Sequence, residues 1–179
     1  VVNFNKGISQ RINLSSDRTI LSLTTISFDI FVLESLVPLM NGCEVVIGSS
    51  EDQKDTNRLA QLLKETTIDT VQMTPSHVKL LLSSEKSEEM LRNVKTLLVG
   101  GEAFPLITLK ELQKVYNGRI FNMYGPTETT VWSSIKELTN EESITIGTPI
   151  LNTSIYIVDE DMNLQPYGIS GELCIGGLG

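Results

Sequence analysis

The stretch NMYGPTETTVW, residues 122–132, gathers several chemically different side chains within a few positions. Tyr124 offers an aromatic face on which a purine base could stack, and Asn122 can both donate and accept at the edge of a base. Thr127 offers a hydroxyl to a phosphate, and Glu128 offers a hard oxygen ligand for Mg²⁺. A plain turn also explains these residues, with the threonine capping a helix and the glutamate near its positive end. The residues alone leave both interpretations open.

Other candidate binding residues follow predicted strands. The paired glycines of VGGEA, residues 99–103, would let a flat ligand approach the backbone, although a strand-to-helix turn is the simpler explanation. Asp29 stands before an apolar helix, where it could bind an ammonium group or simply cap the helix. His77 has no identifiable Ser or Cys partner, so we expect no catalytic role for it. No helix follows GELCIGGLG, residues 171–179, so its glycines indicate strands and turns rather than a dinucleotide site.

The elements that must position these residues alternate between strands and helices. Short apolar runs predict strands at 19–25, 43–48, 69–74, 94–100 and 119–124. Apolar residues at helical spacing predict helices at 29–42, 55–66, 74–82 and 105–116. The first of these helices is apolar nearly all round, so we expect it to be buried. The alternation predicts an α/β fold, with a parallel sheet covered by helices on both faces.

Near residue 145 the pattern changes to short strands joined by turns, which is typical of antiparallel structure. We therefore place a boundary between residues 1–145 and residues 146–179. In open α/β sheets, ligands bind beyond the carboxyl ends of the strands. The stretches expected to meet there in one crevice are 24–29, 72–76, 99–103 and 122–128.

The bulk composition narrows the class of protein. The chain has 179 residues, enough for a domain with a core, and its net charge of −8 disfavours a nucleic-acid partner. No apolar stretch approaches the roughly 20 residues that span a bilayer, and the first residues lack the apolar core of a secretion signal. Cys43 and Cys174 form no CxxC motif and indicate thiols in a reducing cytoplasm.

Four motifs, in their order along the chain, resemble the core motifs of the adenylation domains of nonribosomal peptide synthetases. They are SFDIF (27–31), GGEA (100–103), NMYGPTET (122–129) and GELCIGGLG (171–179). These domains belong to the adenylate-forming, AMP-binding superfamily. The resemblance covers essentially the whole chain and implies a flavodoxin-like subdomain over residues 1–145, followed by the start of a distorted antiparallel β-barrel over 146–179. The pair Phe28–Asp29 before the helix resembles the motif of enzymes that activate amino acids rather than fatty acids.

Such domains form an aminoacyl-adenylate from an amino acid and Mg-ATP, and then pass the acyl group to the phosphopantetheine thiol of a carrier protein. The residues that the resemblance places at the nucleotide are Gly101, Glu102, Ala103, Asn122, Tyr124, Gly125 and Thr127. Tyr124 would stack on adenine, and Asn122 would bind the edge of the base. Thr127 at the α-phosphate and Glu128 at the Mg²⁺ would be the catalytic residues.

The resemblance also implies an amino-acid pocket in which Asp29 pairs with the substrate ammonium. Its lining would be Asp29, Ile30, Leu33, Gln72, Leu98, Gly100, Met123, Val131 and Trp132. This set resembles the lining of glycine-activating domains. Trp132 is large enough to fill the pocket, and forcing an extra methyl group into a filled pocket costs roughly 1–3 kcal/mol. We therefore predict glycine as the substrate, with a plain core role for Trp132 as the alternative.

The resembling enzymes also use a Ser/Thr/Gly-rich phosphate loop, a ribose-binding Asp and a catalytic Lys, which we do not identify here. The chain by itself is therefore expected to be nearly inactive, because the Lys supplies charge as the adenylate forms. Two other functions stay open. One is an acyl- or aryl-acid CoA ligase, which needs no ammonium partner. The other is a non-catalytic nucleotide- or partner-binding module, which the fold alone does not exclude.

Overall fold

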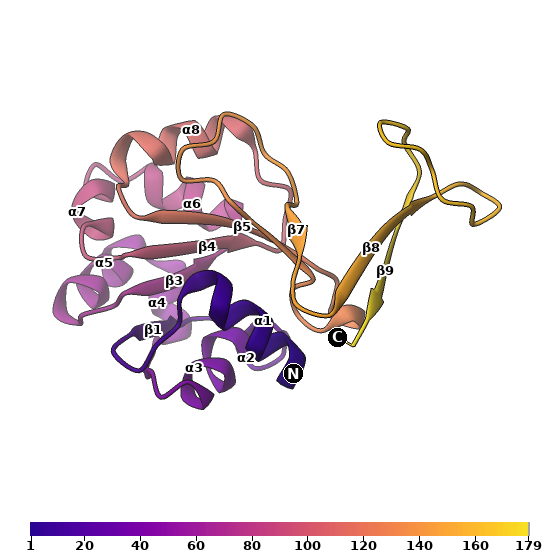
Figure 1. Cartoon of the computed structure of the whole chain (residues 1–179). Coiled ribbons are helices and arrows are strands. Elements are labelled where there is room, and N and C mark those ends of the chain that lie inside the picture. Colours follow the sequence, from indigo (N-terminus) through magenta and orange to yellow (C-terminus); the bar gives the residue numbers. More distant parts are fainter. Residues whose placement is uncertain (179) are drawn as a thin grey trace.

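The computed structural model describes residues 1–178 and has a large mixed sheet at its centre (Figure 1). The strands lie in the order β2-β1-β3-β4-β5-β6-β7. Strands β1 to β5 run parallel, and β6 and β7 are antiparallel to their neighbours. The strands of this sheet are β1 (Thr19–Ser22), β2 (Glu44–Ile47), β3 (Thr70–Met73), β4 (Thr96–Gly100), β5 (Arg119–Tyr124), β6 (Ser134–Glu137) and β7 (Thr148–Pro149).

Helices cover both faces of the sheet (Figure 1). One face carries α1 (Val2–Ile12), α2 (Phe31–Glu34) and α3 (Leu36–Met40). The other carries α5 (Thr56–Glu65), α6 (Pro75–Leu82), α7 (Ser87–Leu91) and α8 (Leu106–Val115). A short helix, α4 (Ser50–Lys54), precedes α5. The predicted α/β class, a mostly parallel sheet between helices, is therefore confirmed.

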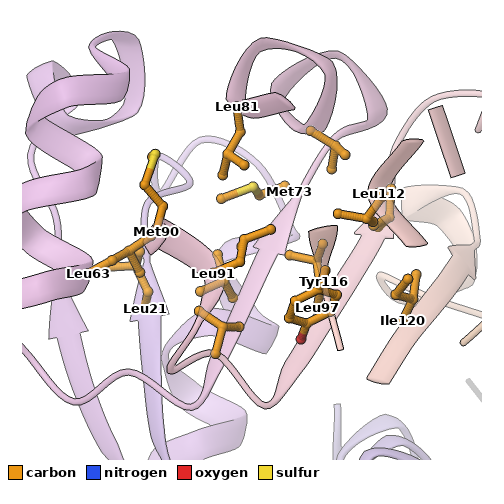
Figure 2. Close-up of a cluster of buried hydrophobic side chains, with 14 of the residues drawn as sticks. Leu21, Leu63, Met73, Leu81, Met90, Leu91, Leu97, Leu112, Tyr116 and Ile120 are labelled. Carbon is orange, nitrogen blue, oxygen red and sulfur yellow. The ribbon is translucent and has the colours of Figure 1, made fainter. Parts of the chain in front are cut away.

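Two hydrophobic cores lie on opposite faces of the sheet, because successive side chains of a strand alternate between its faces. In β4, Leu97 and Val99 pack into the core under α5 to α8, whereas Leu98 packs into the core under α1 to α3. Figure 2 shows the first core, where Leu97 lies among leucine and methionine side chains of the sheet and the helices. The strand residues that point into this first core are not available to a site on the opposite face of the sheet, which α1 to α3 cover.

The last part of the described chain forms a separate hairpin of β8 (Thr153–Val158) and β9 (Glu172–Gly177). It extends away from the large sheet (Figure 1). Strand β7 still belongs to the large sheet, so the change of sheet falls between Pro149 and Thr153. The assignment of residues 146–179 to a β-barrel domain stays a prediction.

The prediction of one buried helix over residues 29–42 is wrong. The segment forms two short helices, α2 and α3, that meet at Ser35 in a non-helical conformation (φ −130°, ψ −73°). Pro38 explains the break, because it lacks the N–H that would bond to Glu34 and its ring would clash with that carbonyl group. The outer side of α3 is open, with Leu39 60% exposed.

Other elements were not predicted. They are α1, α4, α7, β6 and β7. Among residues 1–178, no helix is both long enough and apolar enough to cross a membrane.

Helix α8 offers a direct test of the first core. Leu109 is fully buried, whereas Leu106 on the same helix is 41% exposed. We expect Leu109→Ala to lower the free energy of unfolding by about 2–5 kcal/mol, because it leaves a cavity between α8 and the sheet. Leu106→Ala should lower it by less than about 1 kcal/mol. Urea unfolding of both variants measures the difference, and equal losses would contradict this packing.

Candidate functional site

The candidate site lies at the carboxyl edge of the parallel strands. Two hollows adjoin there and share Gly101, the first residue after β4. Gly101 has a left-handed backbone (φ +87°), and the side chains of Ile30 and Thr74 lie within 4 Å of where its Cβ would be. The loops after β1, β3 and β4 therefore meet at this glycine. The sequence predicted one crevice, and the structure divides it into these two hollows.

The larger hollow, of about 620 Å³, contains the predicted nucleotide-binding residues except Thr127. It is lined by Gly101, Glu102, Ala103, Phe104, Asn122, Met123, Tyr124, Gly125, Pro126, Trp132, Ile144, Thr145 and Ile146. Tyr124 is 37% exposed, so part of its ring is open to a ligand. Asn122 is buried, and its amide Nδ2 donates to the carbonyl oxygen of Thr145 at 2.8 Å. Stacking of a flat base on Tyr124 is the chemistry this hollow suits best.

The segment 144–146, which forms one wall of this hollow, was missed in the sequence analysis. It is held by Asn122 and by Ser134, whose Oγ donates to the carbonyl oxygen of Ile146 at 2.7 Å. The signal that could have found it is the alternation of Ile144 and Ile146 around the polar Thr145. Asn122 thus builds the hollow in addition to lining it.

Glu102 uses its side chain for structure. Its carboxylate accepts hydrogen bonds from the backbone N–H (3.2 Å) and the hydroxyl of Ser76, in the first turn of α6. A carboxylate there satisfies an N–H that has no partner within the helix. The backbone of residues 101–103, rather than the Glu102 carboxylate, is the part best placed for a flat ligand.

Thr127 and Glu128 lie in a short 3₁₀ turn, Thr127–Thr129, and both are exposed. The residue before this turn is Pro126, and no side chain caps it, so the threonine-cap interpretation is wrong. Among the described residues, no group of three His, Cys, Asp or Glu side chains could hold a metal. The single carboxylate of Glu128 is compatible with Mg²⁺, because this ion commonly takes one or two carboxylates together with substrate phosphates.

Six of the nine predicted substrate-pocket residues come together on the face of the sheet that α1 to α3 cover. Leu33, Leu98, Met123, Val131 and Trp132 are buried in one cluster, and Ile30 packs against it. A Cβ on Gly100 would lie 2.7 Å from Cη2 of Trp132, so the indole crosses β4 directly over this glycine. Only glycine at position 100 accommodates that crossing without displacement.

Asp29 has an unusual environment for a carboxylate. The residue before α2 is Ile30, and no side chain caps this helix, so the N-cap interpretation of Asp29 is wrong. Within the described part of the chain, Oδ2 of Asp29 is buried and has no hydrogen-bond partner. A buried charged oxygen without a partner is costly, and a cationic ligand would relieve that cost.

The backbone that delivers Trp132 is strained. Thr130 and Val131 have successive left-handed conformations (φ 68° and 66°), which are rare for β-branched residues. Such strain amounts to about 1–3 kcal/mol per residue and concentrates at functional sites. The hydrogen bond from the N–H of Ser133 to the carbonyl oxygen of Tyr124 (2.8 Å) holds the turn closed. The sequence of residues 129–132, TTVW, gave no indication of this backbone conformation.

Glu34, a second residue that the sequence analysis missed, is a buried carboxylate behind the pocket. Its Oε2 accepts from the backbone N–H groups of Leu23 (2.9 Å) and Thr24 (2.7 Å). Its Oε1 accepts from the hydroxyl of Thr24 (2.7 Å) and from Nε2 of Gln72 (3.3 Å). Burial raises the pKa of Glu34, because lost hydration outweighs these hydrogen bonds, which lower it.

Comparison with known proteins identifies the class to which this arrangement belongs. The whole chain, residues 1–179, matches the family model of the AMP-binding enzymes. The chain therefore belongs to the AMP-binding enzyme family, and the predicted superfamily is confirmed.

The relatives are much larger proteins, and the chain spans only a small part of the length of each. The chain is 39% identical over 181 residues to a dimodular nonribosomal peptide synthase of Bacillus subtilis (strain 168), covering 99% of the chain and 7% of that protein. It is 35% identical over 165 residues to tyrocidine synthase 3 of Brevibacillus parabrevis, covering 91% of the chain and 2% of that protein. A solved structure, holo-AB3403, a four-domain nonribosomal peptide synthetase bound to AMP and glycine, is similar with a TM-score of 0.90 and 39% identity. That likeness covers 98% of this chain and 13% of the solved one.

The crossing of Trp132 over Gly100 predicts a position-specific effect. Gly100→Ala should lower the free energy of unfolding by about 1–3 kcal/mol, because the new methyl group overlaps the indole and the backbone of Met123. Gly176→Ala is the matched control, since a Cβ there meets nothing within 4 Å. Urea unfolding of both variants measures the effect. A Gly100→Ala variant as stable as the control would mean that the indole lies elsewhere.

The raised pKa of Glu34 predicts a pH dependence of stability. Because the pKa of Glu34 is higher in the folded chain than in the unfolded chain, the folded chain binds this proton more tightly, and the resulting stability is present below the ordinary pKa of 4.5 and is lost as pH rises through the raised value. Glu34→Gln removes the titration. The difference in free energy of unfolding, parent minus variant, should therefore fall as pH rises from about 4 to 8. Glu111→Gln, at an exposed position on α8, should show a flat difference in the same urea titrations.

Proposed function

We propose that this chain is the substrate-selecting part of an amino-acid adenylation domain in a nonribosomal peptide synthetase. The reaction is amino acid plus ATP to aminoacyl-AMP plus pyrophosphate, followed by transfer to the phosphopantetheine thiol of a peptidyl carrier protein. The observation that carries the proposal is the shared wall between the nucleotide-sized hollow and the apolar cluster. Met123 and Trp132 belong to both, so a base on Tyr124 and an amino acid beside Asp29 would be neighbours.

The residues would act mainly by binding and orientation. Tyr124 stacks on adenine, with the backbone of residues 101–103 across the ring, and Asp29 pairs with the substrate ammonium. Thr127 would hydrogen-bond the α-phosphate. Glu128 would hold Mg²⁺, which when bound would supply positive charge to the phosphate oxygens.

The chain needs no general base for this reaction. The carboxylate of the amino acid is already ionised at neutral pH, and it attacks the α-phosphorus while the bond to pyrophosphate breaks. Positioning of two bound reactants supplies much of the rate enhancement. We propose that the phosphate loop and the catalytic Lys come from other parts of the full-length protein, so the chain alone is nearly inactive.

We propose glycine as the substrate. The apolar cluster is closed, with Trp132 2% and Met123 2% exposed, so a side chain could enter it only by displacing these residues. A methyl group forced into a filled site costs about 1–3 kcal/mol, equivalent to roughly 10–100-fold discrimination against alanine. The 39% identical solved synthetase, which was bound to AMP and glycine, supports the same assignment.

Asp29 gives the decisive variant for this proposal. In the full-length protein that carries this chain, Asp29→Asn should lower kcat/KM for glycine in pyrophosphate exchange by about 30-fold or more, because the ammonium loses its charged partner. Asp161→Asn, on the exposed hairpin, is the control and should leave exchange unchanged.

The same assay separates the other functions. Exchange driven by acyl or aryl acids and insensitive to Asp29→Asn would indicate a CoA ligase. AMP binding without exchange for any acid would indicate a non-catalytic module. Stronger exchange with leucine or phenylalanine than with glycine would refute the proposed substrate.

A further inference from the structure

A chain of buried hydrogen bonds runs from the loop after β1 to the pocket wall. Thr24 and Leu23 donate to Glu34, Gln72 donates to Glu34, and Trp132 donates through Nε1 to Oε1 of Gln72 at 3.2 Å. Glu34, Gln72 and Trp132 are 1%, 7% and 2% exposed, so bulk water does not replace these partners. These hydrogen bonds link α2, β3 and the strained turn after β5.

We propose that Glu34 is a positioning residue that determines substrate selectivity by locking the Trp132 indole through Gln72. This inference rests on the proposed amino-acid pocket and adds a residue outside its lining. Glu34 would touch neither the amino acid nor the nucleotide. Its effect would be to keep the pocket closed to side chains larger than that of glycine.

The direction of the hydrogen bonds carries the argument. Four donors face the two oxygens of Glu34, which is the pattern of a carboxylate that only accepts. Oε1 of Glu34 therefore requires the NH₂ side of the Gln72 amide, and this turns the amide oxygen toward the indole. An NH₂ group at position 34 would reverse the amide, and two donors would then face each other at Trp132.

An indole that loses its acceptor could move where the structure leaves open space beside it. Gly100 lies against Cη2 on one side, where there is no room even for a methyl group. Trp132 also lines the hollow of about 620 Å³. Movement into that hollow would take the indole away from Gly100 and the apolar cluster, and the site would then admit alanine.

Glu34→Gln in the full-length protein tests this idea without a change in side-chain size. The ratio of kcat/KM for glycine to that for alanine, measured by pyrophosphate exchange, should fall about tenfold. The ratio does not depend on the fraction of folded enzyme, so a partly unstable variant still gives a valid result. Glu111→Gln is the matched control and should keep the parent ratio.

A swapped double variant provides the rescue. In Glu34→Gln/Gln72→Glu, the carboxylate introduced at position 72 accepts from both the new amide and the Trp132 N–H. The glycine-to-alanine ratio should return to within about threefold of the parent value. If Glu34→Gln yields no folded enzyme, the swapped variant decides alone: a glycine-selective enzyme supports the proposal, and a folded, unselective one overturns it.

The indole N–H gives a readout that does not depend on the substrate. Its ¹H–¹⁵N signal is the one lost in Trp132→Phe. It should move upfield in Glu34→Gln, because the N–H loses its acceptor, and return in the swapped variant. If the parent enzyme prefers an amino acid other than glycine, the substrate proposal fails while this signal still judges the role of Glu34. An unchanged signal and an unchanged selectivity ratio in Glu34→Gln would overturn the inference.

Discussion

The hydrogen bond from the indole of Trp132 to Gln72 joins two parts of the chain that are far apart in sequence. It ties the turn after β5 to strand β3 in the middle of the sheet. Because both groups are buried, the bond cannot be exchanged for one to water without opening the core. Two other features fit the position it gives the ring: a glycine at position 100, which the ring covers, and the left-handed backbone of Val131, which turns the chain inward.

Parallel topology explains how the proposed nucleotide site and the proposed amino-acid site can adjoin. The strands β1, β3, β4 and β5 end at one edge, so the loops that follow them share the space beyond it. Gly101 is the point at which the two hollows meet, and Trp132 is the wall between the larger hollow and the apolar cluster. Tyr124 and Glu102 thus lie on the open side of this wall, and the apolar cluster lies behind it.

The sequence predicted the parallel sheet because buried strands and amphipathic helices leave strong periodic signals. It failed where one residue overrides a pattern, as Pro38 does when it divides an apolar stretch into two helices. Glu34 was missed because its partners come from β3 and from the loop after β1, and such long-range hydrogen bonds have no periodicity. The turn at Thr130 and Val131 has left-handed conformations that β-branched residues disfavour, so propensity argued against the observed structure.

The most direct test of the account is a crystal structure of the full-length protein with a non-hydrolysable analogue of glycyl-AMP. We expect the base on the ring of Tyr124, the ammonium within hydrogen-bond distance of Oδ2 of Asp29, and the Trp132 indole still bonded to Gln72. An analogue bound away from the edge shared by β4 and β5, or an ammonium that meets no contact with Asp29, would contradict it.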